Sequence, residues 1–242
     1  KGIRYDVTSH NDDFEIYDVV NDPEESNNLA EGMSVLQQQM KDKSLQVRRV
    51  DASAPRPYDN ESIPGCNIAG LSPGIQKKIF DGKQMWVPDF ELLTPVDSSV
   101  VEYIDSYTED RDSLVGLYYK AYLKIETRGS YTFYLESSSP SHIKIHDIHL
   151  LDNDFTYTEE EITASLNLDI GLHPIRIYYQ QNEQVETILN LNISGPGMAK
   201  QSIPKSMLFH LPNTSVGLEK INQLQDLKVF PQPVDKTLNV VV

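Results

Sequence analysis

Apolar and polar side chains alternate along the first twenty residues of the chain. Apolar residues such as Ile3 and Phe14 alternate with polar ones on either side of a turn-forming polar run at 10–13. A period of two interrupted by turn residues predicts two strands, at residues 2–9 and 14–20, that form a hairpin.

The spacing of apolar residues changes after Asn28. They recur at intervals of four, three and four, which places them on one face of an amphipathic helix. Asn27 or Asn28 is expected to cap this helix, which should cover a small sheet. The residues of the stripe are Leu29, Met33, Leu36 and Met40.

Prolines and glycines interrupt any regular period between about Val50 and Gly74, which predicts a linker over residues 51–73. Beyond it, short apolar runs separated by turn residues are typical of a β-sandwich or barrel. Gly129 and Gly171 stand where a turn is expected to need positive φ. The clearest predicted strands are 117–126, 130–136, 142–145, 148–151, 162–168, 173–180 and 187–194.

Charge and composition limit the classes of partner. The net charge of −15 and the pI near 4.7 argue against nucleic acid and membrane surfaces. The sequence has no apolar run of about 18 residues and opens on Lys1-Gly2-Ile3, so we expect an internal part of a longer protein. The single cysteine, Cys66, is expected to be buried and inert.

Three histidines near an aspartate suggest zinc, because imidazole and carboxylate groups bind it well. If the neighbouring isoleucines face inward on a strand, however, His142 points outward and His146-Asp147 becomes a hairpin turn. We therefore expect no metal site. The four residues are His142, His146, Asp147 and His149.

Acidic clusters at 152–154 and 159–161 contain the carboxylate pairs that glycoside hydrolysis uses. In a chain this acidic we interpret them as solvated loops. The only tryptophan, Trp86, is expected to pack in the core rather than against a sugar ring. The sequence thus predicts no catalytic centre.

Residues 14–30, with the sequence F-E-I-Y-D-V-V-N-D-P-E-E-S-N-N-L-A, resemble the E-L-Y-D-L-x-x-D-P-x-E-x-x-N-L signature of the sulfatase C-terminal subdomain. The resemblance implies a sulfatase-type hairpin and helix over residues 1–50. It also implies that the parent is a secreted sulfatase. Its C/S-x-P-x-R catalytic motif is absent here, because Pro57 replaces the final Arg after Ser53 and Asn67 follows Cys66.

Residues 74–212 resemble the protective-antigen domain, an antiparallel β-sandwich found in glycosidases and adhesins. In its sugar-binding members a loop with adjacent aspartates holds calcium, which glycan hydroxyls join. Serines replace those aspartates here, and hydroxyls alone bind calcium poorly, so no cofactor is expected. Calcium-free sugar contacts are expected from Ser138, Ser139, Ser141 and His142. The matching stretches are F-D-G at 80–82, W-V-P-D-F at 86–90, G-S-Y-T-F-Y-L at 129–135, G-L-H-P-I at 171–175 and G-P-G at 195–197.

The tail, L-K-V-F-P-Q-P-V-D-K-T-L-N-V at 227–240, resembles the opening of type IX secretion sorting domains, with Gln232 where Asn is usual. The resemblance implies a secreted, periplasmic or cell-surface protein of a Gram-negative bacterium. Residues 213–242 are therefore expected to be a C-terminal extension, either a sorting signal or a final edge strand.

The sequence predicts a mainly β chain, with an antiparallel sandwich after a small hairpin-plus-helix segment. Its expected function is that of a non-catalytic accessory region that positions a secreted sulfatase on a glycan. The alternative is a structural module that docks on the catalytic domain without binding sugar. Exposed aromatic residues near Ser138 would favour sugar binding, whereas an exposed apolar patch on the hairpin or sandwich would favour docking.

Overall fold

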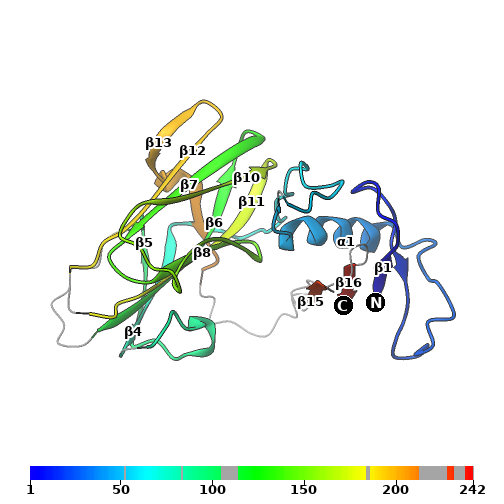
Figure 1. Ribbon diagram of the computed structural model, residues 1–242, viewed down its shortest axis with the longest axis horizontal. Coiled ribbons are helices and arrows are strands. Elements are labelled where there is room, and N and C mark those ends of the chain that lie inside the picture. The colour runs from blue at the N-terminus through cyan, green and yellow to red at the C-terminus, as the bar shows by residue number, and fades with distance from the viewer. Residues whose placement is uncertain are drawn as a thin grey trace. The chain divides into compact units, whose positions relative to one another are not determined.

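The computed structural model describes residues 1–51, 53–82, 84–104, 114–183, 186–212, 228–231 and 238–241. The chain divides into two compact units (Figure 1). We call residues 1–61 with the C-terminal strands the terminal unit, and residues 62–212 the sandwich unit. Most described elements are strands, which confirms the mainly β class. Within the described ranges, no helix is long and apolar enough to cross a membrane.

The terminal unit contains a four-stranded antiparallel sheet in the order β15-β16-β1-β2. The predicted N-terminal hairpin is present but short, since only Gly2 and Ile3 pair with Ile16 and Glu15. An isolated two-stranded hairpin is marginal in water, and pairing of β16 with β1 widens it. The strands are β1 (Gly2–Arg4), β2 (Glu15–Ile16), β15 (Lys228–Pro231) and β16 (Leu238–Val241).

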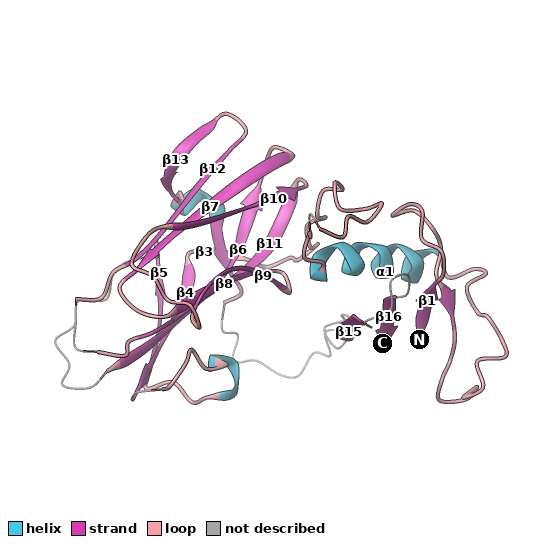
Figure 2. Cartoon of the chain, viewed as in Figure 1, coloured by secondary structure: helices cyan, strands magenta, loops and turns pink. Residues whose placement is uncertain are grey.

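Helix α1 (Ser34–Val47) packs on this sheet through Met40, which contacts Phe14 and Ile16 in a small apolar core (Figure 2). The helix begins later than predicted, because Gly32 has a φ of 81° that a helix does not allow. The predicted asparagine cap is wrong. The position before the helix is Met33, which makes no side-chain cap, and the Asn28 side chain instead accepts the backbone N–H groups of Ile16 and Ala30.

Gln37 joins α1 to the strand region. Its buried amide accepts a hydrogen bond from Phe14 N at 2.9 Å and donates one to Phe14 O at 2.6 Å. We expect Gln37→Leu to destabilise the terminal unit by about 2 kcal/mol, because both backbone groups lose their partner. Helical circular dichroism during urea unfolding measures this, since α1 is the only α-helix in the described part of the chain. The exposed Gln39→Leu is the control, and equal stability of the two variants would contradict the prediction.

The sandwich unit holds two antiparallel sheets (Figure 2). The smaller has the order β10-β7-β12-β13, and the larger runs β3-β14-β6-β11-β8-β9, with β4 pairing with both β6 and β5. Their strands are β3 (Ser72–Pro73), β4 (Ile75–Asp81), β5 (Asp97–Val101), β6 (Val115–Ile125), β7 (Gly129–Ser137), β8 (Ser141–Ile145), β9 (Ile148–Asn153), β10 (Ile162–Leu168), β11 (Gly171–Gln180), β12 (Leu189–Gly195), β13 (Met198–Ser202) and β14 (Leu208–His210). Two 3₁₀ turns, η1 (Phe90–Leu92) and η2 (Lys205–Met207), complete the unit.

All seven strands predicted for this region are present, with ends shifted by a few residues. Alternate residues of each sheet point inward and form one core, for example Tyr119, Phe133 and Ile177, which are fully buried. The alternation that predicted the strands therefore also predicted which residues pack between the sheets.

The two glycines singled out in the sequence have different roles. Gly171 has a φ of 141°, as expected, and lies against the backbone of Gly65. Gly129 does not have positive φ, so that expectation is wrong. A Cβ there would lie 2.4 Å from the Pro196 ring, so the glycine is required by close packing.

The segment around Ile63 and Cys66, within the predicted linker, runs along the sandwich. Ile63 N donates a hydrogen bond to Asn167 O, and Ile63 O accepts one from Asp169 N. Cys66 N donates to Leu172 O. Cys66 is half-buried rather than buried as expected, because its segment lies on the outer edge of these strands.

Candidate functional site

A cleft of about 1070 Å³ opens at one end of the sandwich unit. Antiparallel pairing brings four segments to this end: the β7–β8, β9–β10 and β11–β12 loops and the segment that follows β4. The described lining consists of Met85, Trp86, residues 136–140, Asp154, Phe155, Tyr157, Glu159, Asn182, Glu183, Glu186 and Ile188. The cleft is therefore formed by loops held on rigid strands, which is where binding residues are often found.

Two large aromatic side chains at the cleft are open to solvent. Trp86 is 62% exposed and Phe155 is 98% exposed. The expected core packing of Trp86 is wrong. Its neighbours Val87 and Phe90 fill the apolar space beneath the loop, so the indole projects outward. Tyr157, also in the cleft lining, is half-buried, and its hydroxyl donates a hydrogen bond to Ser137 O at 3.2 Å.

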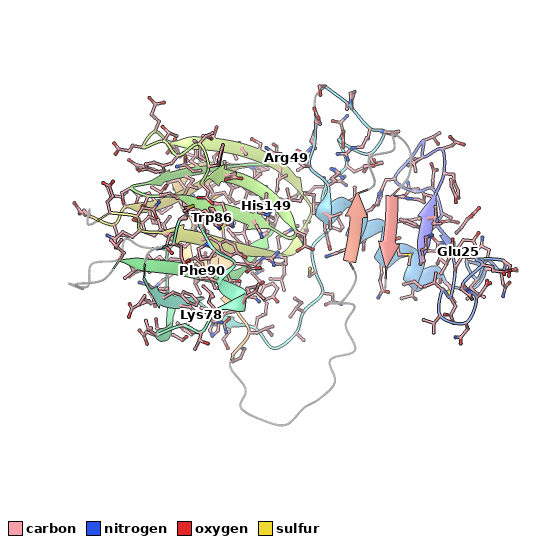
Figure 3. All side chains as sticks on the ribbon, turned by 60° about the horizontal axis from the view of Figure 1, so that its bottom comes forward. Glu25, Arg49, Lys78, Trp86, Phe90 and His149 are labelled. Carbon is pink, nitrogen blue, oxygen red and sulfur yellow. The ribbon has the colours of Figure 1, made fainter. Side chains whose placement is uncertain are left out.

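The segment that carries Trp86 is anchored by Phe90, which is buried (Figure 3). The Phe90 ring stacks on Phe80 with a centroid distance of 4.6 Å and on Tyr178 at 6.2 Å. Gly116 leaves room for it, because a Cβ there would lie 2.5 Å from the Phe90 ring. Asp154 also holds this segment in place, because its carboxylate accepts a hydrogen bond from Val87 N at 3.1 Å. Burial raises the pKa of this carboxyl.

Ser138 and Ser139 lie in the cleft wall, and both hydroxyls already hold loops together. Ser138 Oγ accepts Ile188 N at 2.8 Å and lies 3.1 Å from the Tyr179 hydroxyl, and Ser139 Oγ accepts Asn182 N at 3.0 Å. The other two candidate residues lie below the surface. Ser141 is fully buried and bonds to Ser137 Oγ at 2.7 Å. Of the four candidates only Ser138 is partly exposed, because Ser139 is just 3% exposed.

The loop that the resemblance assigns to calcium does not fit this ion. Its hydroxyls are held by Tyr179 and by backbone N–H groups, and it offers no carboxylate of its own. Calcium prefers carboxylate and carbonyl oxygens, and N–H donors occupy the hydroxyl lone pairs that would face it.

His142 lies on the face of β8 opposite the core, as expected, but it is covered rather than exposed. Its ring stacks on Tyr178 at 4.3 Å and lies 5.3 Å from the His149 ring. Only 9% of the residue is exposed, and burial lowers the pKa of the imidazole to about 3. The side chain is therefore neutral throughout the physiological range.

His146 occupies the predicted turn with Asp147, between β8 and β9, with a φ of 51°. Its Nε2 lies 2.9 Å from His173 Nδ1, and His173 Nε2 lies 2.8 Å from Asp169 O. A carbonyl only accepts, so His173 carries its proton on Nε2 and His146 donates to it. Cys66 Sγ lies 3.9 Å from the remaining nitrogen, His146 Nδ1. Across the described residues, no three metal-ligating side chains converge.

Sequence reasoning missed Phe155 and set Trp86 aside. Phe155 follows Asp152-Asn153-Asp154, a turn-rich polar run in which an isolated aromatic ring has no strand periodicity to bury it. The acidic clusters separate in the structure. Asp154 and Glu159 line the cleft, whereas Glu161 pairs with Lys200 at 2.6 Å.

The antiparallel β-sandwich with a cleft formed by loops at one end identifies this region as a β-sandwich binding-type module. The family model of the PA14 domain matches residues 71–206, and the chain belongs to this family. The family assignment confirms the resemblance to the protective-antigen domain seen in the sequence. No curated protein matches the chain.

Several solved structures are similar over this region. An anti-sigma factor domain-containing protein from Clostridium clariflavum is 18% identical with a TM-score of 0.49, and the match covers 60% of this chain but only 50% of that one. The PA14 sugar-binding domain from an RTX adhesin is 11% identical, covering 57% and 98% at a TM-score of 0.49. The epithelial adhesin 9 A domain from Candida glabrata, in complex with Galβ1-3GlcNAc, is 11% identical, covering 63% and 95% at a TM-score of 0.48.

Proposed function

We propose that the sandwich unit is a carbohydrate-binding module that holds glycan in the loop-borne cleft without calcium. The observation that carries the proposal is the exposure of Trp86 at the cleft, beside the wall formed by Ser138 and Ser139. A large indole costs free energy when it is left in water, and its flat face matches the apolar face of a sugar ring. Membership of the PA14 family supports the same function.

The larger setting is part of this proposal. We propose that the chain is the non-catalytic accessory region of a secreted sulfatase-like enzyme, which it positions on its glycan substrate. The sequence of residues 14–30 and the tail at 227–240 support this setting. The part of the tail between β15 and β16 lies outside the described residues. Docking on a catalytic domain without sugar is the competing function, and the experiment below separates the two.

We expect the full chain to bind a subset of glycans on an array equally well with calcium and with chelator. Trp86→Ala should weaken that binding by roughly 30-fold, since loss of an aromatic anchor costs about 2 kcal/mol. Titration calorimetry with the selected glycan measures the change. Met85→Ala is the matched control, because this neighbour is similarly exposed at the same cleft but has no flat ring.

Two results would count against the proposal. Absence of binding to every glycan under both conditions would leave docking as the function. Binding that survives Trp86→Ala, or that disappears with chelator, would show that sugar is held elsewhere or through calcium.

A further inference from the structure

The described lining of the cleft has an unbalanced charge. It contains carboxylates from the end of β7 and from the β9–β10 and β11–β12 loops, and no lysine or arginine within the described part of the chain. In a cleft with low-dielectric walls, charges of one sign reinforce one another and raise the local concentration of the opposite ion. The acidic residues are Glu136, Asp154, Glu159, Glu183 and Glu186.

Two of these carboxylates have structural partners. Glu136 accepts a hydrogen bond from Asn190 Nδ2 at 3.0 Å, and Asp154 accepts one from Val87 N. Glu159, Glu183 and Glu186 are exposed, and none forms an ion pair with another described residue. We call these three glutamates the acidic rim.

Three basic residues of the sandwich unit form ion pairs outside the described cleft lining. Arg176 pairs with Asp147 at 2.9 Å, Lys120 with Glu91 at 3.0 Å, and Lys200 with Glu161. None of these three cations belongs to the described lining, and their partners are not the glutamates of the acidic rim.

The aromatic rings point to the same ligand charge independently of the acids. The face of an indole or phenyl ring is electron-rich and attracts a cation within about 6 Å of its centre. Trp86 and Phe155 both present exposed rings at the cleft. A sugar that stacks on such a ring and carries an ammonium group gains from both contacts.

We propose that the cleft prefers glycans with protonated amino groups, that is, de-N-acetylated hexosamines, over the same glycans in neutral or anionic form. This inference rests on the proposed carbohydrate binding. The ammonium group faces the acidic rim while the ring stacks on Trp86. Sulfate and uronate groups are repelled by the same carboxylates, so a sulfated substrate of the proposed parent enzyme must place an unsulfated amino sugar in the cleft.

The test compares pairs of oligosaccharides that share one backbone and differ only in N-acetylation. Both forms are titrated near pH 6, where amino sugars are charged. We expect the amino form to bind about 10-fold more tightly, since three exposed charge pairs each contribute modestly. The preference should shrink in 0.5 M salt because exposed charges are screened.

Glu159→Gln/Glu183→Gln/Glu186→Gln should remove the preference by weakening binding of the amino form, whereas the N-acetylated form should lose much less affinity. The control with the same loss of charge is Glu102→Gln/Glu126→Gln/Glu160→Gln. These glutamates are exposed on the same unit and lie outside the cleft lining, and the control should keep the preference.

The outcomes separate the two proposals. Trp86-dependent binding of both forms with equal affinity would overturn the amino-sugar preference and leave carbohydrate binding standing. Failure of every glycan to bind would overturn both. Spermidine that binds as tightly as the amino glycan, with or without Trp86, would show simple attraction of cations and overturn the preference.

Discussion

Phe90→Ala is expected to destabilise the sandwich unit by about 3 to 5 kcal/mol, the usual cost of removing a large aromatic side chain from a packed core. The ring is 1% exposed and stacks on Phe80 and Tyr178 over the space left by Gly116. Little else fills that space, because the cluster beneath the loop contains only Val87 and Tyr118 besides these residues.

The same substitution should weaken glycan binding, although Phe90 does not line the cleft. The Phe90 ring anchors the segment that presents Trp86, and its loss releases that segment from the sheet. Urea unfolding followed by near-ultraviolet circular dichroism of the tyrosines measures stability, and calorimetry measures affinity. Leu92→Ala is the matched control, because it removes an 83% exposed side chain from the same turn. Phe90→Ala behaving like Leu92→Ala would show that the ring does not anchor the loop.

Lowering the pH from 7 to 5 is expected to cost the sandwich unit about 2 kcal/mol through His142 alone. Burial lowers the pKa of this imidazole from 6.5 to about 3. Between these values the unfolded chain binds the proton and the folded chain does not, so stability falls as the pH drops below 6.5. At pH 5 the difference is about 1.5 pH units at 1.36 kcal/mol each. His149 and Lys144 lower the pKa further, whereas Asp152 raises it.

Other groups modify this pH dependence in known directions. Burial also lowers the pKa of His173, which adds to the loss of stability in acid. The raised pKa of Asp154 acts in the opposite sense, because a folded carboxyl that holds its proton more tightly gains stability as the pH falls.

The test of the His142 prediction is His142→Phe, which keeps a ring against Tyr178 and cannot be protonated. The loss of stability between pH 7 and 5 should shrink by about 2 kcal/mol. His149→Phe, on the exposed neighbour, should reduce the loss much less, because burial is the main cause of the lowered pKa of His142 and His149 only adds to it. Equal pH dependence in the His142 variant and the parent would mean that the imidazole is hydrated in the folded protein.

The strands of the sandwich were predictable because their signal is local. Alternation in runs such as 162–168 requires only that one face be buried. The terminal sheet was harder to predict, because β1 pairs with β16 across almost the whole chain. Local periodicity predicted a hairpin at the N-terminus, but it did not indicate that β16 pairs with the other edge of β1. The early start and asparagine cap assigned to the helix failed because the Asn28 side chain bonds a strand instead.

The sequence identified one loop that lines the cleft, but not the aromatic residues exposed there. The loop at 137–141 was identified from its resemblance to a known family, and it does form one wall. The exposure of Trp86 depends on whether Phe90 or Trp86 fills the space over Gly116, which is a competition between two rings a few residues apart. Hydrophobicity alone does not decide that competition, since both side chains gain from burial.

Pairing of Gly2 with Val240 has a consequence for how the chain assembles during synthesis. Strand β1 leaves the ribosome well before β16 and lacks that partner until β16 is complete. The sandwich, which lies between them in sequence, can reach its native state in that interval. Once folded, it shortens the flexible chain that separates the two strands and lowers the entropy cost of bringing them together. In that order of events, closure of the terminal sheet follows folding of the domain that lies between its strands in sequence.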